Sequence, residues 1–294
     1  MSLTDVASPK ISFEFFPPKT PVGQEKLRVT YATLAEQNPA FFSVTFGAGG
    51  STQAGTRDTV LEIHGAGHQA APHLSCVGSS AEQLRSILSE YKAHGVRRVV
   101  ALRGDLPSGY GGSDKSAGQF RYANELVEFI RNEMGDWFHI EVAAYPEMHP
   151  QAKSPADDVA NFVRKARAGA DSAITQVFYN TDAYFWFVDE VRQAGIDTPI
   201  IPGILPITNY AQLARFTDAC GAEIPRWLQL KLASYHDDTA SLCAFGTEVV
   251  SEICERLISG GAPGLHFYTM NQAAPTLAIL DNLELTATDA YAYA

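Results

Sequence analysis

Strand-like and helix-like segments alternate along almost the whole chain, and this alternation limits the fold more than any other feature. Eight runs have the pattern of strands, and they span residues 11–16, 41–46, 70–75, 97–103, 139–145, 172–178, 199–205 and 264–269. The run 97–103 has the pattern of a strand buried on both faces, as in parallel sheets. Patterns typical of helices span residues 24–37, 57–65, 80–94, 155–168, 181–194, 209–220, 238–259 and 275–283. Because strand–helix–strand connections produce parallel strands, the sequence predicts an α/β protein with a parallel sheet.

Two arrangements fit this order, a closed (β/α)8 barrel and an open doubly wound sheet. The number of repeats, the length of 294 residues and the lack of a Gly-rich dinucleotide fingerprint favour the barrel. The composition shows no break along the chain. We therefore expect residues 1–294 to form a single (β/α)8 TIM barrel, one catalytic domain without a separate regulatory domain.

The charge and cysteine content exclude several classes of function. The net charge is −11 and no run of Lys or Arg occurs, which disfavours a nucleic-acid-binding protein. The four cysteines lack metal-site spacing, which fits a reduced compartment and predicts no metal site. No apolar run reaches membrane-spanning length, and the first ten residues contain no apolar signal core. The sequence therefore predicts a cytoplasmic protein that binds neither a membrane nor nucleic acid.

Polar residues occupy the carboxyl ends of seven of the eight expected strands. They are Glu14, Thr45, His73, Arg103 with Asp105, Tyr145, Gln176 and Tyr268. Any one of them has an ordinary structural explanation, such as a hydrogen-bonded core histidine for His73. In a barrel, however, these ends surround one mouth, where active sites are found. The set as a whole therefore predicts a functional site at this end of the barrel.

The two carboxylates of this set, Glu14 and Asp105, are expected to differ in their surroundings. Glu14 alternates with Phe13 and Phe15, so its side chain points away from theirs. In an aromatic-lined mouth, desolvation would raise the pKa of Glu14 and keep it protonated near neutral pH, although a partly exposed strand glutamate is an equal alternative. Asp105 follows Arg103 by two residues, and this cation favours an ionised carboxylate. Gly104, between them, allows a close approach of the backbone.

A series of short motifs runs in order from about residue 11 to residue 283. They are FEFFPP (13–18), SVTFGAG (43–49), APHL (71–74), ALRGD (101–105), AYPEMHP (144–150), ITQ (174–176), PGILP (202–206) and HFYT (266–269). In this series the chain resembles the methylenetetrahydrofolate reductase family. The resemblance implies a (β/α)8 barrel that holds FAD and transfers hydride from NADH or NADPH to methylenetetrahydrofolate in a ping-pong reaction, giving methyltetrahydrofolate. It does not separate NADH from NADPH, and it leaves a homo-oligomer possible.

The resemblance also implies roles for individual residues. Glu14 matches the family's general acid, and Asp105 matches an aspartate beside the flavin that meets the pterin. Gln176, Gln212 and Phe216 match substrate-binding positions. The positions that match contacts with FAD or, for Thr45, with the nicotinamide nucleotide are Thr45, Ala48, His73, Arg103, Gly104, Asp105, Tyr122, Ala123, Tyr145, His149, Ala152, Asp158, Asn161, Arg164 and Lys165. Arg103, Arg164 and Lys165 suit a diphosphate in an otherwise acidic protein.

One position departs from the family pattern. Gln272 stands where the family has an arginine expected to touch the substrate, which affects folate affinity but not flavin chemistry. Two rival functions follow from other classes of protein: a pterin-binding barrel that transfers a methyl group without redox chemistry, and a catalytically silent folate or flavin carrier. The many positions that match FAD contacts argue against the first rival, whereas Gln272 allows the second.

Overall fold

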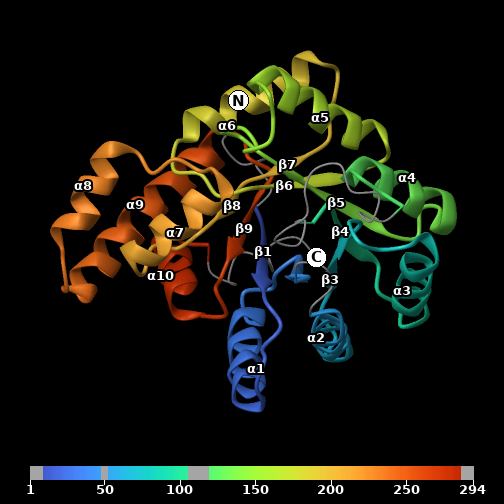
Figure 1. The fold of residues 1–294 in the computed structure, drawn as a ribbon. Helices are drawn as coiled ribbons and strands as arrows, with labels where there is room; N and C mark the ends of the chain where they lie inside the picture. Colours follow the sequence, from blue (N-terminus) through green and yellow to red (C-terminus); the bar gives the residue numbers. More distant parts are fainter. Residues whose placement is uncertain (1–8, 48–51, 105–118, 286–294) are drawn as a thin grey trace, which may run out of the picture.

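The structure, a computed structural model, describes residues 9–47, 52–104 and 119–285 (Figure 1). The strands are β1 (Lys10–Phe15), β2 (Phe41–Val44), β3 (Ala70–Ser75), β4 (Arg98–Leu102), β5 (His139–Ala144), β6 (Ser172–Thr175), β7 (Ile200–Ile201), β8 (Gly203–Ile204) and β9 (Gly264–Tyr268). The helices are α1 (Pro21–Ala35), α2 (Gln53–Gly65), α3 (Ala81–Ala93), α4 (Ala123–Met134), α5 (Pro155–Arg167), α6 (Thr181–Gln193), α7 (Tyr210–Cys220), α8 (Arg226–Ser234), α9 (Thr239–Ser259) and α10 (Ala274–Asn282).

The strands form one parallel sheet that closes on itself. Their order is β7-β6-β5-β4-β3-β2-β1-β9-β8, and β7 and β8 are separated in the chain by Pro202 alone. The run 199–205, expected as one strand, is therefore broken in two: β7 pairs with β6, and β8 pairs with β9. Chain continuity across Pro202 joins the two ends of the sheet, and the helices surround it (Figure 1). The predicted (β/α)8 barrel is confirmed.

The closure point requires a glycine. A Cβ atom on Gly203 would lie 2.3 Å from the Thr175 carbonyl oxygen and 2.6 Å from a ring carbon of Tyr268. The Gly203 N–H donates a 2.8 Å hydrogen bond to the Thr175 hydroxyl, a side chain on the neighbouring β6. A larger residue here would separate β6 from β9, because no side chain fits between them.

Two helices of the structure are absent from the sequence prediction, and two others, α1 and α2, begin three and four residues earlier than expected. The additional helices are α4 and α8. Helix α1 begins at Pro21 instead of residue 24, because the Thr20 hydroxyl accepts a 3.1 Å hydrogen bond from the Gly23 N–H and caps the first turn. In the described part of the chain, no helix combines the length and apolar character that crossing a bilayer requires.

Apolar residues alternate between two layers. Phe13, Phe42 and Phe267 are fully buried in the large cluster between the sheet and the helices. A second, smaller cluster of Phe41, Ala71, Val100 and Ile174 comes from four strands at the alternate positions. These side chains fill the barrel interior, so the barrel has a packed centre and its functional surface lies at the mouth.

Toward the amino ends of the strands, the interior contains a buried carboxylate. Glu141 on β5 is fully buried, accepts a 2.6 Å hydrogen bond from the Ser172 hydroxyl and forms an ion pair with Arg98. Its carboxylate also lies 3.3 Å from His139 Nε2. Burial alone would raise the pKa of Glu141, but its imidazole, guanidinium and hydroxyl partners together lower it.

This buried carboxylate gives a first prediction, that Glu141→Gln lowers the free energy of unfolding by about 2–3 kcal/mol near neutral pH. This loss of stability is smaller than the ~3–5 kcal/mol that removal of one partner of a buried ion pair costs, because the amide still accepts a hydrogen bond. A folded-state pKa below that of the unfolded chain gives stability that is present above about pH 4.5 and is lost as the pH falls through the folded value. The variant should therefore lose part of the acid dependence seen in urea unfolding.

The matched control is Glu133→Gln, which removes a carboxylate from a surface pair. Glu133 binds Arg85 at 2.7 Å, and both side chains are partly exposed. Exposed pairs contribute ~0–1 kcal/mol, so this variant should change unfolding little. Equal effects of the two substitutions would contradict the role given to burial.

Candidate active site at the barrel mouth

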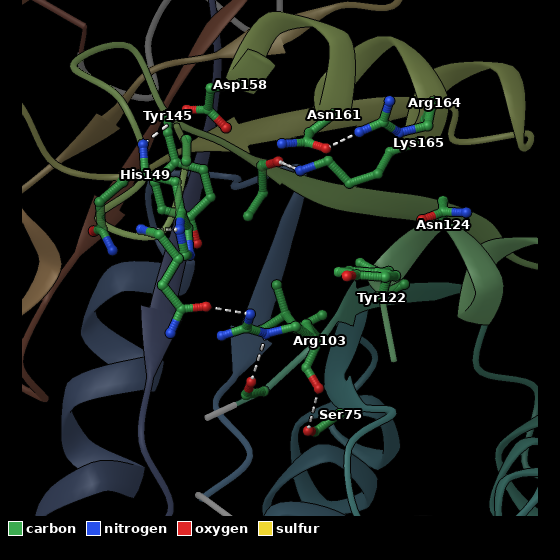
Figure 2. Close-up of a pocket in the computed structure, with 18 of the residues that line it drawn as sticks. Ser75, Arg103, Tyr122, Asn124, Tyr145, His149, Asp158, Asn161, Arg164 and Lys165 are labelled. Atoms are coloured by element: carbon green, nitrogen blue, oxygen red, sulfur yellow. Dashed lines mark hydrogen bonds between the residues drawn. The ribbon is translucent and has the colours of Figure 1, made fainter. Parts of the chain in front are cut away.

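A cavity of about 840 Å³ opens at the carboxyl ends of β3, β4, β5 and β6. It lies between these strand ends, the first turn of α4 and the length of α5 from Asp157 to Lys165 (Figure 2). Its lining residues are Phe46, Gly47, Ser75, Ala101, Leu102, Arg103, Gly104, Tyr122, Ala123, Asn124, Ala143, Tyr145, His149, Gln151, Ala152, Lys153, Asp157, Asp158, Asn161, Arg164, Lys165 and Gln176. The volume suits a large ligand, because typical small-molecule sites enclose roughly 300–1,000 Å³.

Four cations line this cavity in a protein of net charge −11: Arg103, Lys153, Arg164 and Lys165. In the view of Figure 2, Arg103 lies on one side and Arg164 and Lys165 lie on the other. The Arg103 guanidinium donates to the Gln151 side-chain oxygen at 2.5 Å and to the Gly104 carbonyl at 3.2 Å. Arg164 donates to the Asn161 side-chain oxygen. Both guanidinium groups are thus held by neutral acceptors, which leaves their charge for an anionic ligand.

Lys165 is a buried cation of this cavity. Among the described residues its ammonium group forms no ion pair within 4 Å, and it donates a hydrogen bond to the Ala143 carbonyl. Burial lowers the pKa of Lys165 to about 8, against a smaller opposing effect of Asp158. An anion bound in the cavity would restore a favourable environment for the charged form.

The turn after β4 brings the backbone into close contact with β3, as the position of Gly104 in the sequence predicts. Gly104 has φ +83°, and a Cβ atom there would lie 1.7 Å from the Ser75 hydroxyl. The Ser75 hydroxyl donates a 3.0 Å hydrogen bond to the Arg103 carbonyl. Any side chain at 104 would displace this contact and with it Arg103.

A second polar cluster lies in the barrel interior around Glu14. Its carboxylate is 3.2 Å from His73 Nε2, 3.5 Å from His266 Nε2 and 3.4 Å from the Ser43 hydroxyl. These partners come from the strands adjacent to β1 and from β3. His266 is fully buried, and its Nδ1 lies 2.7 Å from the Ser12 hydroxyl. Glu14 thus points into the barrel, as its alternation with Phe13 and Phe15 predicts.

The expected protonation of Glu14 is wrong for the protein without ligands. Burial raises its pKa, but the charges and hydrogen bonds of His73 and His266 lower it to about 2. The reason is the identity of the facing residues: the aromatic neighbours in sequence face the helices, whereas imidazoles face the carboxylate. Glu14 is therefore ionised at neutral pH.

The cavity brings together twelve of the residues selected from the sequence. They are Arg103, Gly104, Tyr122, Ala123, Tyr145, His149, Ala152, Asp158, Asn161, Arg164, Lys165 and Gln176. Ala48 and Asp105 lie outside the described residues. His73 belongs to the Glu14 cluster, and Thr45 adjoins the cavity-lining Phe46.

Three predicted substrate residues lie apart from the cavity lining. Gln212 and Phe216 are on α7, where Gln212 is exposed and Phe216 packs against the core. Gln272 is exposed in the turn after β9, where its N–H donates a 2.9 Å hydrogen bond to the Thr269 carbonyl. These residues are carried by elements at the barrel rim, and the cavity does not enclose them.

Several lining residues were not expected from the sequence, including Ser75, Asn124, Gln151 and Asp157. Most of them are next to an expected residue in the chain, and this proximity in sequence is the signal that could have identified them. Gln151 is informative, because it holds the Arg103 guanidinium from a loop 48 positions away.

A (β/α)8 barrel with a cationic cavity at the carboxyl ends of its strands has the architecture of a barrel enzyme that binds an anionic ligand. Comparison with known proteins defines the family. The family model for methylenetetrahydrofolate reductase matches residues 2–284, and the chain belongs to this family of oxidoreductases.

Relatives in bacteria and plants agree with this assignment. The 5,10-methylenetetrahydrofolate reductase of Escherichia coli (strain K12) is 39% identical over 274 residues, which cover 93% of this chain and 90% of that protein. Methylenetetrahydrofolate reductase (NADH) 1 of Arabidopsis thaliana is 37% identical over 298 residues, covering 97% of this chain and 50% of that protein.

A solved structure shares the fold at low sequence identity. It is an uncharacterized protein from Clostridium thermocellum that binds two copies of 5-methyl-5,6,7,8-tetrahydrofolic acid. The TM-score is 0.63 with 15% identity, over 94% of this chain and 93% of that chain.

Proposed function

We propose that this protein reduces 5,10-methylenetetrahydrofolate to 5-methyltetrahydrofolate in a ping-pong reaction, with FAD held in the 840 Å³ cavity and NADH or NADPH as electron donor. The observation that carries the proposal is that the chain belongs to this family and has a cavity lined by four cations. One of them is a buried lysine without an ion pair among the described residues. When bound, the flavin supplies the site that accepts hydride from the nicotinamide and donates it to the folate.

The chain's own residues would hold the cofactor by charge and by aromatic contact. Arg103, Arg164 and Lys165 suit the diphosphate, because charge-assisted hydrogen bonds to anions are the strongest type available. Tyr145 and His149 pack edge to face with ring centroids 4.6 Å apart at the cavity wall. Gln176, at the end of β6, presents an amide to the same cavity for substrate binding.

Glu14 would deliver the proton that opens the folate's five-membered ring. Because the carboxylate is ionised in the free protein, it must acquire this proton when the substrate binds. A ligand that covers the mouth adds to the burial that already raises the pKa of Glu14. Glu14 would then act as a general acid toward the folate nitrogen.

The experiment that tests the proposal is an absorption spectrum of the purified protein before and after addition of NADH or NADPH. We expect a flavin spectrum that bleaches with the nicotinamide and recovers with methylenetetrahydrofolate. The name of the Arabidopsis relative specifies NADH, so NADH is the first donor to test. A colourless protein that cannot be reconstituted with FAD would favour the methyl-transferring barrel, and a flavin that does not bleach would favour the carrier.

Gln272 gives a second prediction, on substrate affinity. Gln272→Arg should tighten folate binding roughly two- to fivefold, because an exposed cation opposite an anionic substrate contributes ~0.2–1 kcal/mol. Gln272→Met is the uncharged control, and flavin reduction by the nicotinamide should remain unchanged in both variants. Unchanged or weaker folate binding in Gln272→Arg would show that the substrate does not reach this turn.

A further inference from the structure

Two carboxylates hold the loop that lines one wall of the cavity, which we call the cofactor loop (residues 145–152). Asp158 on α5 accepts a 2.8 Å hydrogen bond from the His149 N–H. Glu147, within the loop, turns outward and accepts a 2.8 Å hydrogen bond from the Glu223 N–H, just beyond α7. The loop is thus fastened to α5 on one side and to the end of α7 on the other.

A tight packing contact accompanies the hydrogen bond to Glu223. Gly221 ends α7 with φ +74°, and a Cβ atom there would lie 2.7 Å from a ring carbon of Pro150 in the cofactor loop. Within the loop, Met148 has φ +87°, a conformation that costs a non-glycine residue energy. The surrounding contacts, including the Glu147 hydrogen bond, keep the loop in this conformation.

The second carboxylate oxygen of Glu147 is buried and has no hydrogen-bond partner among the described residues. It adjoins a small cavity of about 70 Å³ whose wall includes Trp186 and Phe187 of α6. Burial, opposed by the Glu223 N–H and assisted by the Glu223 carboxylate, raises the pKa of Glu147 to about 7. This group is therefore poised between its charged and neutral forms near physiological pH.

We propose that Glu147 is a positioning residue that ties the cofactor loop to α7, so that the ionisation of this carboxyl sets the placement of Gln212 and Phe216 relative to the bound cofactor. The inference rests on the proposed function, since the resemblance to the family implies that these two α7 residues bind the folate. Glu147 lies between Tyr145 and His149 in sequence and is not itself among the residues that line the large cavity. Its action passes through the loop and the helix.

The charged groups around Glu147 determine the direction of the effect. From the α7 end, Glu223 repels its negative charge, and the Cys220 thiol stays neutral because burial raises its pKa. From α5, Asp158 shares the small cavity, but its carboxylate already accepts the His149 N–H. On the loop itself the neighbours are Tyr145 and His149, whereas α6 contributes uncharged rings.

Ionised Glu147 therefore accepts the Glu223 N–H in a charge-assisted hydrogen bond, which is roughly twice as strong as a neutral one. Protonation below about pH 7 weakens this bond and relieves the repulsion from Glu223. Because the pKa of Glu147 is raised in this position, the cost of burying the charge and the repulsion from Glu223 exceed the gain from the stronger bond. The tether between the cofactor loop and α7 is therefore stronger below about pH 7 and weaker above it.

The test follows the Glu223 backbone amide by ¹⁵N NMR in the full-length flavin-bound protein between about pH 5.5 and 8.5. We expect its chemical shift to titrate with a midpoint near 7 in the parent protein. Glu147→Gln keeps an acceptor for the N–H but cannot ionise, so the titration should disappear. Glu223→Gln removes the repelling charge and should move the midpoint to lower pH. A Glu223 amide that does not titrate, or that titrates equally in Glu147→Gln, overturns the inference.

Folate binding provides the second measurement. Glu147→Ala should weaken methylenetetrahydrofolate binding by up to about tenfold, the equivalent of one lost hydrogen bond, with little change in FAD content. In Glu147→Gln, the dissociation constant of the folate should no longer vary with pH around 7. Unchanged folate affinity in Glu147→Ala overturns the positioning role. A protein that binds no flavin yet shows the Glu223 titration overturns the proposed function instead, so the two failures are distinguishable.

Discussion

Replacing Glu14 by glutamine is expected to slow the folate half-reaction by roughly 10²–10⁴-fold, the usual contribution of a positioned general acid. Glutamine retains the shape of the side chain and its hydrogen-bonding capacity toward Ser43, but it cannot release a proton. Hydride transfer from the nicotinamide to the flavin needs no such proton. That half-reaction should therefore proceed at nearly the parent rate, and stopped-flow measurement of the two half-reactions separates the effects.

Glu141→Gln is the matched control for this experiment. Both glutamates lie in the barrel interior and both have a lowered pKa, but Glu141 lies toward the amino ends of the strands, away from the mouth. The Glu141→Gln variant should leave the rates of both half-reactions unchanged when they are measured well below the unfolding temperature of the variant. Equal slowing of the two half-reactions in Glu14→Gln would make Glu14 a structural or flavin-tuning residue.

The low pKa of Glu14 allows the pH dependence of the folate half-reaction to be used as a second measurement. A carboxyl with a pKa of about 2 in the free protein does not titrate between about pH 5 and 9, so free Glu14 cannot cause pH dependence in that range. Any dependence of the folate half-reaction that is lost in Glu14→Gln must then arise in the substrate complex. This outcome would locate the uptake of the proton at the moment of folate binding.

The sequence was sufficient for the fold because each strand is bounded by its own stop signal and buried on both faces. Helix α8 shows where this reasoning fails: Trp227 and Leu230 are 57% and 60% exposed, so its apolar residues do not keep to one face and no helical period emerges. The break in the seventh expected strand could not be predicted from the sequence either. Pro202 lies inside an apolar run, and the need to pair with β6 on one side and β9 on the other comes from barrel closure alone.

The candidate site, like the fold, could be predicted from the sequence only in part. Strand alternation predicted that Glu14 points away from Phe13, but it contains no information about which side chains face it from other strands. His73 and His266 come from positions 59 and 252 residues away, and they reverse the expected direction of the pKa shift. Most of the twelve expected residues that line the cavity lie at strand ends, in the loops that follow them or at helix starts, where local sequence and barrel geometry agree. Asn161, Arg164 and Lys165 instead lie further along α5. The positions of residues on the rim, such as Gln212, depend on how their helix packs against the barrel. The sequence pattern does not specify this packing.

Changing both Arg103 and Lys165 to alanine is expected to weaken FAD binding by roughly 100-fold or more while the protein stays folded. Hydrogen bonds to charged groups contribute ~1.5–3 kcal/mol each, and ~1.4 kcal/mol corresponds to a tenfold change in affinity. Neither side chain forms an ion pair among the described residues, so their removal leaves no orphaned carboxylate there. Thermal unfolding checks the fold, and titration of the apoprotein with FAD gives the affinity.

The pKa of Lys165 allows this loss to be assigned to charge and not to volume. A lysine with a pKa of about 8 loses its charge as the pH rises through 8, so FAD affinity in the parent protein should fall between about pH 7 and 9. Lys165→Arg keeps its charge over that range and should bind FAD with little pH dependence. Arg85→Ala, at a surface ion pair with Glu133, controls for the general effect of removing a cation. Full FAD affinity in the double alanine variant would place the diphosphate elsewhere, whereas a pH dependence retained in Lys165→Arg would assign the titrating group to another residue.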